Sequence, residues 1–228
     1  MPALDRHVKP SNEPDEAVKT ATSLPHRLAF WLSAILSPYI VIPVGTLGIL
    51  YVRSDPSQFF LWAGISIFFS TVLPALYVVA GIFRGTITDV HVMERGQRGG
   101  PFAVAVVGGF LAAYFLRILH APPSVWGLSL ILGVNGLFIW AITSFTKISV
   151  HVSVLSATVL GAIILHPELN PWTLLWMLPA LIWARQARGR HSVWQGIGGC
   201  LLASVVTTAT IIYLKLGDRI LQAFQNAT

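Results

Sequence analysis

Three short polar segments interrupt an otherwise apolar chain, and most of its internal basic and histidine residues lie in them. The segments are residues 84–98, 147–151 and 185–191, and we call them the first, second and third breaks. Guanidinium and ammonium groups bind phosphate oxygens through charge-assisted hydrogen bonds. An imidazole beside them can act as a nucleophile or as a proton carrier. The breaks therefore predict a site for a phosphorylated or otherwise anionic substrate.

The third break has the most defined spacing. Gly189 is expected to end one helix, and the next helix begins near His191, so Arg185 faces His191 across a turn. His191 and Gln195 are separated by four residues and share one helix face. The glutamine can hydrogen-bond one ring nitrogen and leave the other available. The alternative is a positively charged loop that serves only membrane topology.

The other two breaks add further candidates. Lys147 and His151 lie four residues apart at the start of a span, where free backbone N–H groups favour a phosphate oxygen. The first break ends at Arg98 and also holds the carboxylates Asp89 and Glu94. Taken alone, the first break could be a solvated loop and His151 an interfacial side chain. Three such breaks on one membrane face favour a functional site, because ionisable groups at membrane depth are costly.

Composition places these breaks between membrane helices. Of the 228 residues, 54% are hydrophobic and only 11% are charged, against about 25% charged in soluble domains. Runs near 20 apolar residues are long enough to cross the bilayer. The predicted fold is an all-α, polytopic bundle of seven transmembrane helices, or six if one short run is re-entrant. The runs are 28–52, 59–83, 102–120, 124–146, 148–165, 172–184 and 193–214.

Orientation and domain limits follow from the polar residues. With seven spans, eleven of the 15 Lys and Arg residues share the side of the N-terminus and the breaks, and four lie opposite. That bias predicts a cytoplasmic site in a multi-pass protein, with the plasma membrane as the expected location. Residues 1–27 are expected to form a polar tail, 28–216 the membrane domain and 217–228 a short polar tail. Pro38, Pro43, Pro74 and Pro179 fall inside runs and predict kinks.

The composition also limits cofactors and partners. Only nine acidic residues are present, so a hard-metal site rich in carboxylates is not expected. No basic stripe with interleaved aromatic residues indicates nucleic acid, and the expected partners are the bilayer and a lipid phosphate. The single cysteine, Cys200, excludes an intramolecular disulfide. The sequence carries no signal for an oligomeric state.

At this point the breaks resemble the type 2 phosphatidic acid phosphatase superfamily, whose three motifs are KxxxxxxRP, PSGH and SRxxxxxHxxxD. The third break reads ARxxxxxHxxxQ from Ala184, with identical spacing. The second reads Ile-Ser-Val-His, ending at His151. In the first, His91 takes the lysine position and Arg98 the arginine position. The motifs occur in the family order, and the resemblance covers residues 84–214.

The resemblance implies a metal-independent phosphatase without a cofactor. In that family the third-motif histidine attacks phosphorus, which assigns the nucleophile to His191. The second-motif histidine protonates the leaving oxygen, which assigns the general acid to His151. The implied phosphate-binding residues are Arg98, Lys147, Arg185, His91, Ser149 and Arg95.

One departure affects the nucleophile. Gln195 stands where the family has an aspartate that orients the histidine, and the comparable change in a serine protease triad costs about 10⁴ in rate. The sequence therefore leaves three alternatives open: a slow enzyme, a substitute carboxylate, or a protein that is not a phosphatase. Asp89 or Glu94 is the hypothesised substitute.

Four functional readings remain at this stage. The leading one is a phosphatase acting on a membrane lipid phosphate or polyprenyl diphosphate. The second is a non-catalytic relative that binds or moves anionic lipids, which Gln195 favours. A prenyltransferase would need paired Asp-rich motifs with Mg²⁺, and only Asp89 lies near such a position. A pore or a purely structural role is the fourth.

Overall fold

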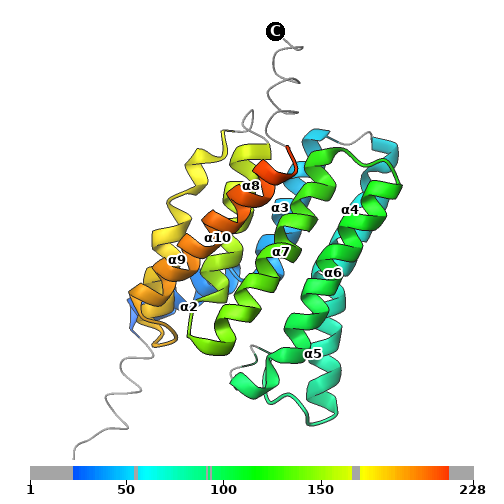
Figure 1. Cartoon of the computed structure of the whole chain (residues 1–228). Helices are drawn as coiled ribbons and strands as arrows, with labels where there is room; N and C mark the ends of the chain where they lie inside the picture. The colour runs from blue at the N-terminus through cyan, green and yellow to red at the C-terminus, as the bar shows by residue number, and fades with distance from the viewer. Residues whose placement is uncertain (1–22, 54–55, 91, 93, 166–169, 216–228) are drawn as a thin grey trace, which may run out of the picture.

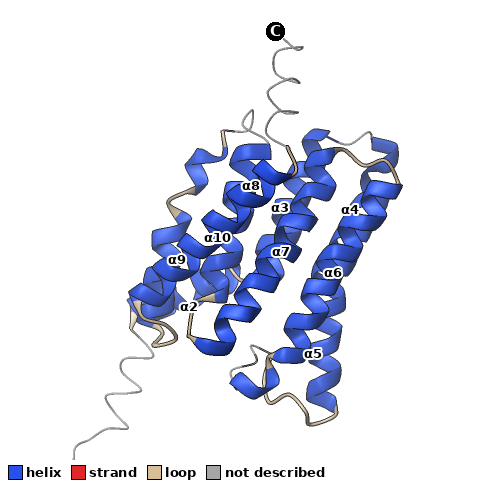
Figure 2. Cartoon of the chain, viewed as in Figure 1, coloured by secondary structure: helices blue, strands red, loops and turns tan. Residues whose placement is uncertain are grey.

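In the computed structural model, which describes residues 23–53, 56–90, 92, 94–165 and 170–215, every regular element is a helix (Figure 2). The α-helices are α2 (Leu24–Ile35), α3 (Pro38–Arg53), α4 (Pro56–Ile67), α5 (Leu73–Phe83), α6 (Gly99–Ile118), α7 (Pro123–Phe145), α8 (Val150–Leu165), α9 (Met177–Ala187) and α10 (Val193–Tyr213). A π-helix, η1 (Phe68–Val72), joins α4 to α5, and η2 (Arg95–Gln97) and η4 (Pro171–Leu174) are short 3₁₀ turns. The predicted all-α class is confirmed.

The helices are long and apolar enough for a multi-pass membrane protein. Four meet the length and hydropathy of a span: Pro56–Phe83, Gly99–Ile118, Pro123–Phe145 and Val193–Tyr213. A fifth is added if α2 and α3, bent by 52° at their junction, count as one span. The remaining apolar runs form the shorter helices α8 and α9. Helices long and apolar enough to span a membrane are therefore present, and length and hydropathy count four or five of them against the six or seven predicted.

The predicted tails lie mostly outside the described residues, which begin at Ser23 and end at Lys215. α2 starts at Leu24, within the last four residues of the expected N-terminal tail. Pro25 lies in the first turn of α2, where a missing N–H costs no intrahelical bond.

Prolines explain two of the irregularities. The bend between α2 and α3 falls at Leu36–Ser37, directly before Pro38. Pro74 has no N–H to donate to the carbonyl of Ser70, and the turn before it is the π-helix η1, closed by a bond from Leu73 N–H to Phe68 O. Pro43 lies inside α3 without dividing it, and Pro179 lies in the first turn of α9.

Taken with α4, η1 and α5 as one span, successive spans from α3 onward alternate in direction, so the loops α5–α6, α7–α8 and α9–α10 lie at one end of the bundle (Figure 1). Small residues allow the helices to approach closely, as in other membrane bundles. A Cβ added to Gly109 in α6 would lie 2.7 Å from the Cα of Gly133 in α7. This contact fixes α6 against α7 near the middle of both helices.

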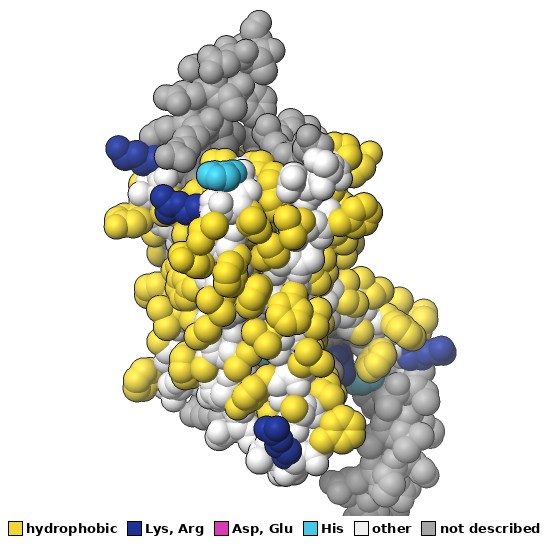
Figure 3. All heavy atoms as spheres, turned by 90° about the vertical axis from the view of Figure 1, so that its right-hand side faces the viewer, with side chains coloured by type: hydrophobic (Ala, Val, Ile, Leu, Met, Phe, Trp, Pro, Cys, Tyr) yellow, Lys and Arg dark blue, Asp and Glu magenta, His cyan; other side chains and the backbone are white. Residues whose placement is uncertain are grey.

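The outer surface is apolar, as a surface that meets lipid requires. Hydrophobic side chains cover the face in Figure 3, and Lys, Arg and His side chains lie toward its two ends. Phe60 is 83% exposed and Phe145 is 87% exposed. Such rings would be unfavourable in water and favourable in the bilayer.

Candidate functional site

The three breaks line one cavity of about 650 Å³ at this end of the bundle. No Asp or Glu of the described residues lines it. The cations and imidazoles that line it come from every break: Arg98, Lys147, His151, Arg185, Arg190 and His191. The cavity is therefore electropositive at its polar end and suits an anion with several oxygen atoms.

The chain turn before His191 is shaped by a glycine. α9 ends at Ala187, and Gly189 follows with a φ of +63°. The backbone N–H groups of Gly189 and Arg190 donate to the carbonyls of Gln186 (2.8 Å) and Arg185 (3.0 Å). This is the Schellman pattern that closes a helix at an αL glycine. It confirms the predicted helix end and turns the chain back toward Arg185.

The His191 ring is held in one tautomer. Gln195 Oε1 lies 3.1 Å from His191 Nδ1 and also accepts a hydrogen bond from the Ser192 backbone N–H at 3.2 Å. A backbone N–H can only donate, so this side-chain atom is the amide oxygen, and Nδ1 must carry the proton. The lone pair of the ring then lies on Nε2. Ser192 Oγ accepts from Gln195 N at 3.3 Å and completes a capping box at the start of α10.

His191 is neutral at physiological pH. Burial and the nearby cations Arg185, Lys147 and Arg98 together lower the pKa of His191 to about 4, against the opposing effect of the hydrogen bond to Gln195. A neutral imidazole with a free lone pair is the form that can attack phosphorus. The same cations that would bind a phosphate therefore keep the ring nucleophilic.

The pH dependence of turnover should report this pKa. If His191 is the nucleophile, we expect kcat/KM to rise with pH through about 4 and to level off above it, because only a neutral ring can attack. Gln195→Glu places an isosteric carboxylate beside Nδ1, which stabilises the imidazolium. The rise of kcat/KM with pH, the acid limb of the profile, should therefore move upward by about 1–3 pH units. Gln186→Glu adds the same charge at an exposed position and should leave the limb in place. An unshifted limb in Gln195→Glu would show that His191 does not set it.

The second break is attached directly to the third. The Ser149 backbone N–H donates to the carbonyl of Gln195 at 3.1 Å, and Ser149 is fully buried. A Cβ on Gly199 would lie 2.9 Å from the Ser149 carbonyl oxygen, so α8 and α10 pack backbone to backbone here. His151, two residues after Ser149, thereby lines the same cavity as His191.

This close contact predicts a matched pair of effects. Gly199→Ala should force α10 away from α8, destabilise the protein by about 1–3 kcal/mol and lower turnover, because overpacking displaces backbone. Gly198→Ala meets only Ile148 Cγ2 at 3.8 Å and should be neutral or stabilising. Melting temperature and phosphate release of both variants check this. Equal behaviour of the two would contradict a site held by the α8–α10 contact.

Arg185 depends on a residue that sequence spacing did not indicate. Its side chain is 6% exposed, and Nη1 donates to Ser33 Oγ of α2 at 2.9 Å. Arg185 Nε is buried without a hydrogen-bond partner in the described part of the chain. A buried guanidinium nitrogen of this kind is costly unless an anion occupies the cavity. Ser33 thus positions the guanidinium that faces the cavity.

Arg98 is fixed by its own break. Its Nε donates to the Val92 carbonyl at 2.9 Å, and Val92 packs with Val78 and Ile87 in a small apolar cluster. The first break therefore folds over an apolar support and directs Arg98 to the cavity. Arg190 also lines the cavity, although sequence analysis did not select it; its position next to His191 is the signal that was available.

The remaining predicted residues lie elsewhere. His91 and the side chain of Arg95 lie outside the described residues. Ser149 is buried and does not line the cavity, and its backbone N–H rather than its hydroxyl makes the hydrogen bond to Gln195. Asp89 and Glu94 do not line the cavity, and Glu94 accepts from Gln97 Nε2 at 2.8 Å on the surface. The side chain that bonds His191 Nδ1 is Gln195.

Comparison with protein-family models, with curated proteins and with solved structures gave no match to this chain. Within the described residues, no group of three or more His, Cys, Asp or Glu side chains is arranged to hold a metal ion. The class that fold and site define is a helical membrane protein with a basic, histidine-containing cavity at one end of its bundle.

Proposed function

We propose that this protein is a metal-independent membrane phosphatase that hydrolyses a lipid phosphate or polyprenyl diphosphate through a phosphohistidine intermediate. The observation that carries the proposal is the fixed tautomer of His191. His191 lines a cavity that is also lined by a second imidazole, His151, and by four cations. The motif resemblance assigns the same two histidines to the same two roles.

The reaction follows from these groups. Nε2 of His191 attacks phosphorus, a P–N bond forms, and the P–O bond to the leaving group breaks. His151 donates a proton to that leaving oxygen and becomes a base. It then takes a proton from water, which attacks the phosphohistidine and releases inorganic phosphate. Arg98, Arg185 and Lys147 stabilise the charge on the transferring phosphoryl oxygens, as fixed cations do in a water-poor site.

The lipid character of the substrate is supported by the rest of the cavity. Beyond its basic end the cavity continues between apolar side chains of α3, α5, α7 and α8, namely Ile42, Val78, Leu132, Ile139 and Val154. A phosphate at the basic end would place its hydrocarbon chain along these residues. Apolar burial of the chain supplies binding energy, and the cations supply the specificity for phosphate.

The topology completes the proposal. α8 has 16 residues, about 24 Å at the usual helical rise, and η4 with α9 provides a pass of similar length. Local thinning of the bilayer accommodates spans of this length. With these two passes the chain crosses seven times. The Lys and Arg distribution supports a site on the cytoplasmic side, and the plasma membrane is the proposed location.

A second function is favoured by one observation, the amide at Gln195. A neutral amide on Nδ1 stabilises the imidazolium less than a carboxylate does. A cavity that binds lipid phosphate without turning it over would use the same cations and the same apolar lining. This non-catalytic reading predicts saturable binding of lipid phosphates with no phosphate release.

Phosphate release in EDTA separates these readings. Purified protein should release phosphate from at least one member of a panel of lipid phosphates and polyprenyl diphosphates in excess EDTA. Binding of the same lipids without release would support the non-catalytic function. Activity that EDTA abolishes and Mg²⁺ restores would overturn the metal-independent mechanism.

A further inference from the structure

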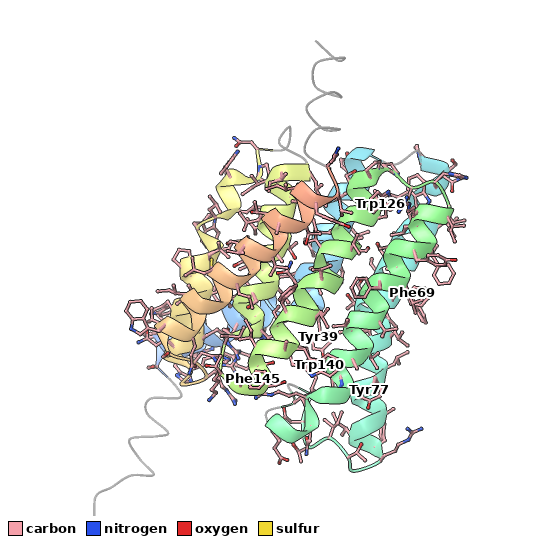
Figure 4. The ribbon with its side chains drawn as sticks, viewed as in Figure 1. Tyr39, Phe69, Tyr77, Trp126, Trp140 and Phe145 are labelled. Atoms are coloured by element: carbon pink, nitrogen blue, oxygen red, sulfur yellow. The ribbon has the colours of Figure 1, made fainter. Side chains whose placement is uncertain are left out.

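Three polar side chains line the cavity far from its basic end. Asn135 belongs to α7, and Ser70 and Thr71 belong to η1. Asn135 lies ten residues before the end of α7 at Phe145, about 15 Å along the axis at the usual helical rise. Figure 4 shows Phe69, the neighbour of Ser70, near mid-height of the bundle. The three side chains therefore lie near the middle of the hydrocarbon layer, which is about 30 Å thick.

Asn135 keeps one polar atom unused. Its Nδ2 donates to the Ile131 carbonyl at 2.9 Å and lies 3.0 Å from Thr207 Oγ1 of α10. A carbonyl can only accept, so this contact identifies the nitrogen and leaves Oδ1 as the remaining atom. Asn135 is 2% exposed, and Oδ1 has no hydrogen-bond partner among the described residues. A buried acceptor in this condition costs about 1–3 kcal/mol until a donor reaches it.

Ser70 and Thr71 differ from most hydroxyls on these helices. Ser and Thr side chains usually donate to the carbonyl four residues earlier, as Thr143, Ser153 and Thr158 do here at 2.7–3.1 Å. Ser70 Oγ and Thr71 Oγ1 are buried and make no such bond within the described structure. Both lie in the π-helix, and π-helical turns occur frequently at functional sites. Their hydroxyl groups remain available to a ligand in the cavity.

We propose that this mid-depth cluster, Asn135, Ser70 and Thr71, binds a hydroxyl group carried on the hydrocarbon chain of the lipid phosphate substrate. The inference rests on the proposed function only in placing a phosphate at the basic end. A hydroxyl can donate to Asn135 Oδ1 and can accept from a side chain such as Ser70 or Thr71, so it matches either kind of group that lines the cavity. An ester carbonyl satisfies the hydroxyls alone, and a plain hydrocarbon chain satisfies none. The cluster thus selects lipids with a hydroxylated chain.

Affinity measured without turnover tests the cluster. The probes are dodecyl phosphate and a series of monohydroxydodecyl phosphates with the hydroxyl moved from carbon 4 to carbon 12. His191→Asn protein in detergent serves as the background, so no probe is consumed. One hydroxyl position should lower the Kd about tenfold relative to dodecyl phosphate, the effect of one well-placed buried hydrogen bond.

Two variants on this background separate recognition from packing. Asn135→Leu removes Oδ1 and should abolish the preference. Thr207→Val breaks the same α7–α10 bond but does not line the cavity, and should keep the preference. Equal Kd values along the series would overturn the proposal and mean that the cluster holds water only. A preference that survives Asn135→Leu would overturn it as well. A hydroxyl preference in a protein that never releases phosphate would keep the subsite and reject the phosphatase.

Discussion

Replacing His191 with asparagine should abolish phosphate release, with kcat/KM lower by about 10⁴-fold or more, as removal of a covalent nucleophile does in other enzymes. Asparagine retains a polar side chain at this position but has no lone pair that can form the P–N bond. The cations that line the cavity remain, so the variant should still bind lipid phosphate. The variant should therefore lose steady-state phosphate release and keep equilibrium binding of lipid phosphate, both measured on the same preparation.

The matched control is His120→Asn. His120 lies at the opposite end of the bundle, after α6, with a φ of +57° that asparagine tolerates. It should leave turnover unchanged. Wild-type protein quenched during turnover of ³²P-labelled lipid should carry label that survives alkali and is lost in acid, as a phosphoramidate is. Label retained in His191→Asn, or full activity in that variant, would assign the nucleophile elsewhere.

The helical elements could be predicted from the sequence because uninterrupted apolar runs of this length have few other structures available in a bilayer. The exceptions have local causes. The structure divides the run 28–52 at Ser37. Hydropathy is uniform through this junction, so in the sequence only Pro38 marks it. The π-helix before Pro74 changes the hydrogen-bond register without changing composition, so sequence predicts a kink there but not its form.

The candidate site could be predicted where its contacts are local. The four-residue spacing of His191 and Gln195 predicted their bond, which the structure gives as 3.1 Å. Ser33 was missed because it meets Arg185 across 152 residues of sequence. Asn135 was missed because its Oδ1 lacks a partner only once Nδ2 is bonded to the Ile131 carbonyl and to Thr207 Oγ1. Spacing along one helix cannot reveal such contacts, since they depend on how the bundle closes.

The low pKa of His191 could not be predicted from the sequence either, and it changes how Gln195 is interpreted. An aspartate in this position would favour the charged ring more strongly than the amide does, whereas burial and three nearby cations favour the neutral ring. A neutral His191 ring, the proposed nucleophile, is therefore available even in mildly acidic solution. What the amide loses is stabilisation of positive charge that develops on the ring as the P–N bond forms. We therefore expect a slow enzyme whose turnover persists over a broad range of acidic pH.

Replacing His151 with alanine should lower phosphate release from alkyl lipid phosphates by about 10³-fold, the usual contribution of a positioned general acid. An alkoxide is a poor leaving group and needs a proton, which the proposed mechanism assigns to His151. A nitrophenolate leaves without one, so p-nitrophenyl phosphate should be hydrolysed by His151→Ala at nearly the wild-type rate of bond cleavage. The size of the defect should therefore depend on the leaving group.

This dependence distinguishes a proton donor from a residue that only shapes the cavity. Loss of cavity shape or of phosphate affinity would lower turnover of both substrates by the same factor. A general acid gives a large defect with the alkyl ester and a small one with the aryl ester, measured as single-turnover rates at saturating protein. Equal defects would remove His151 from the chemistry and leave it a lining residue at the start of α8. Unequal defects would fix the direction of attack, because the proton donor must lie on the leaving-group side of phosphorus, opposite Nε2 of His191.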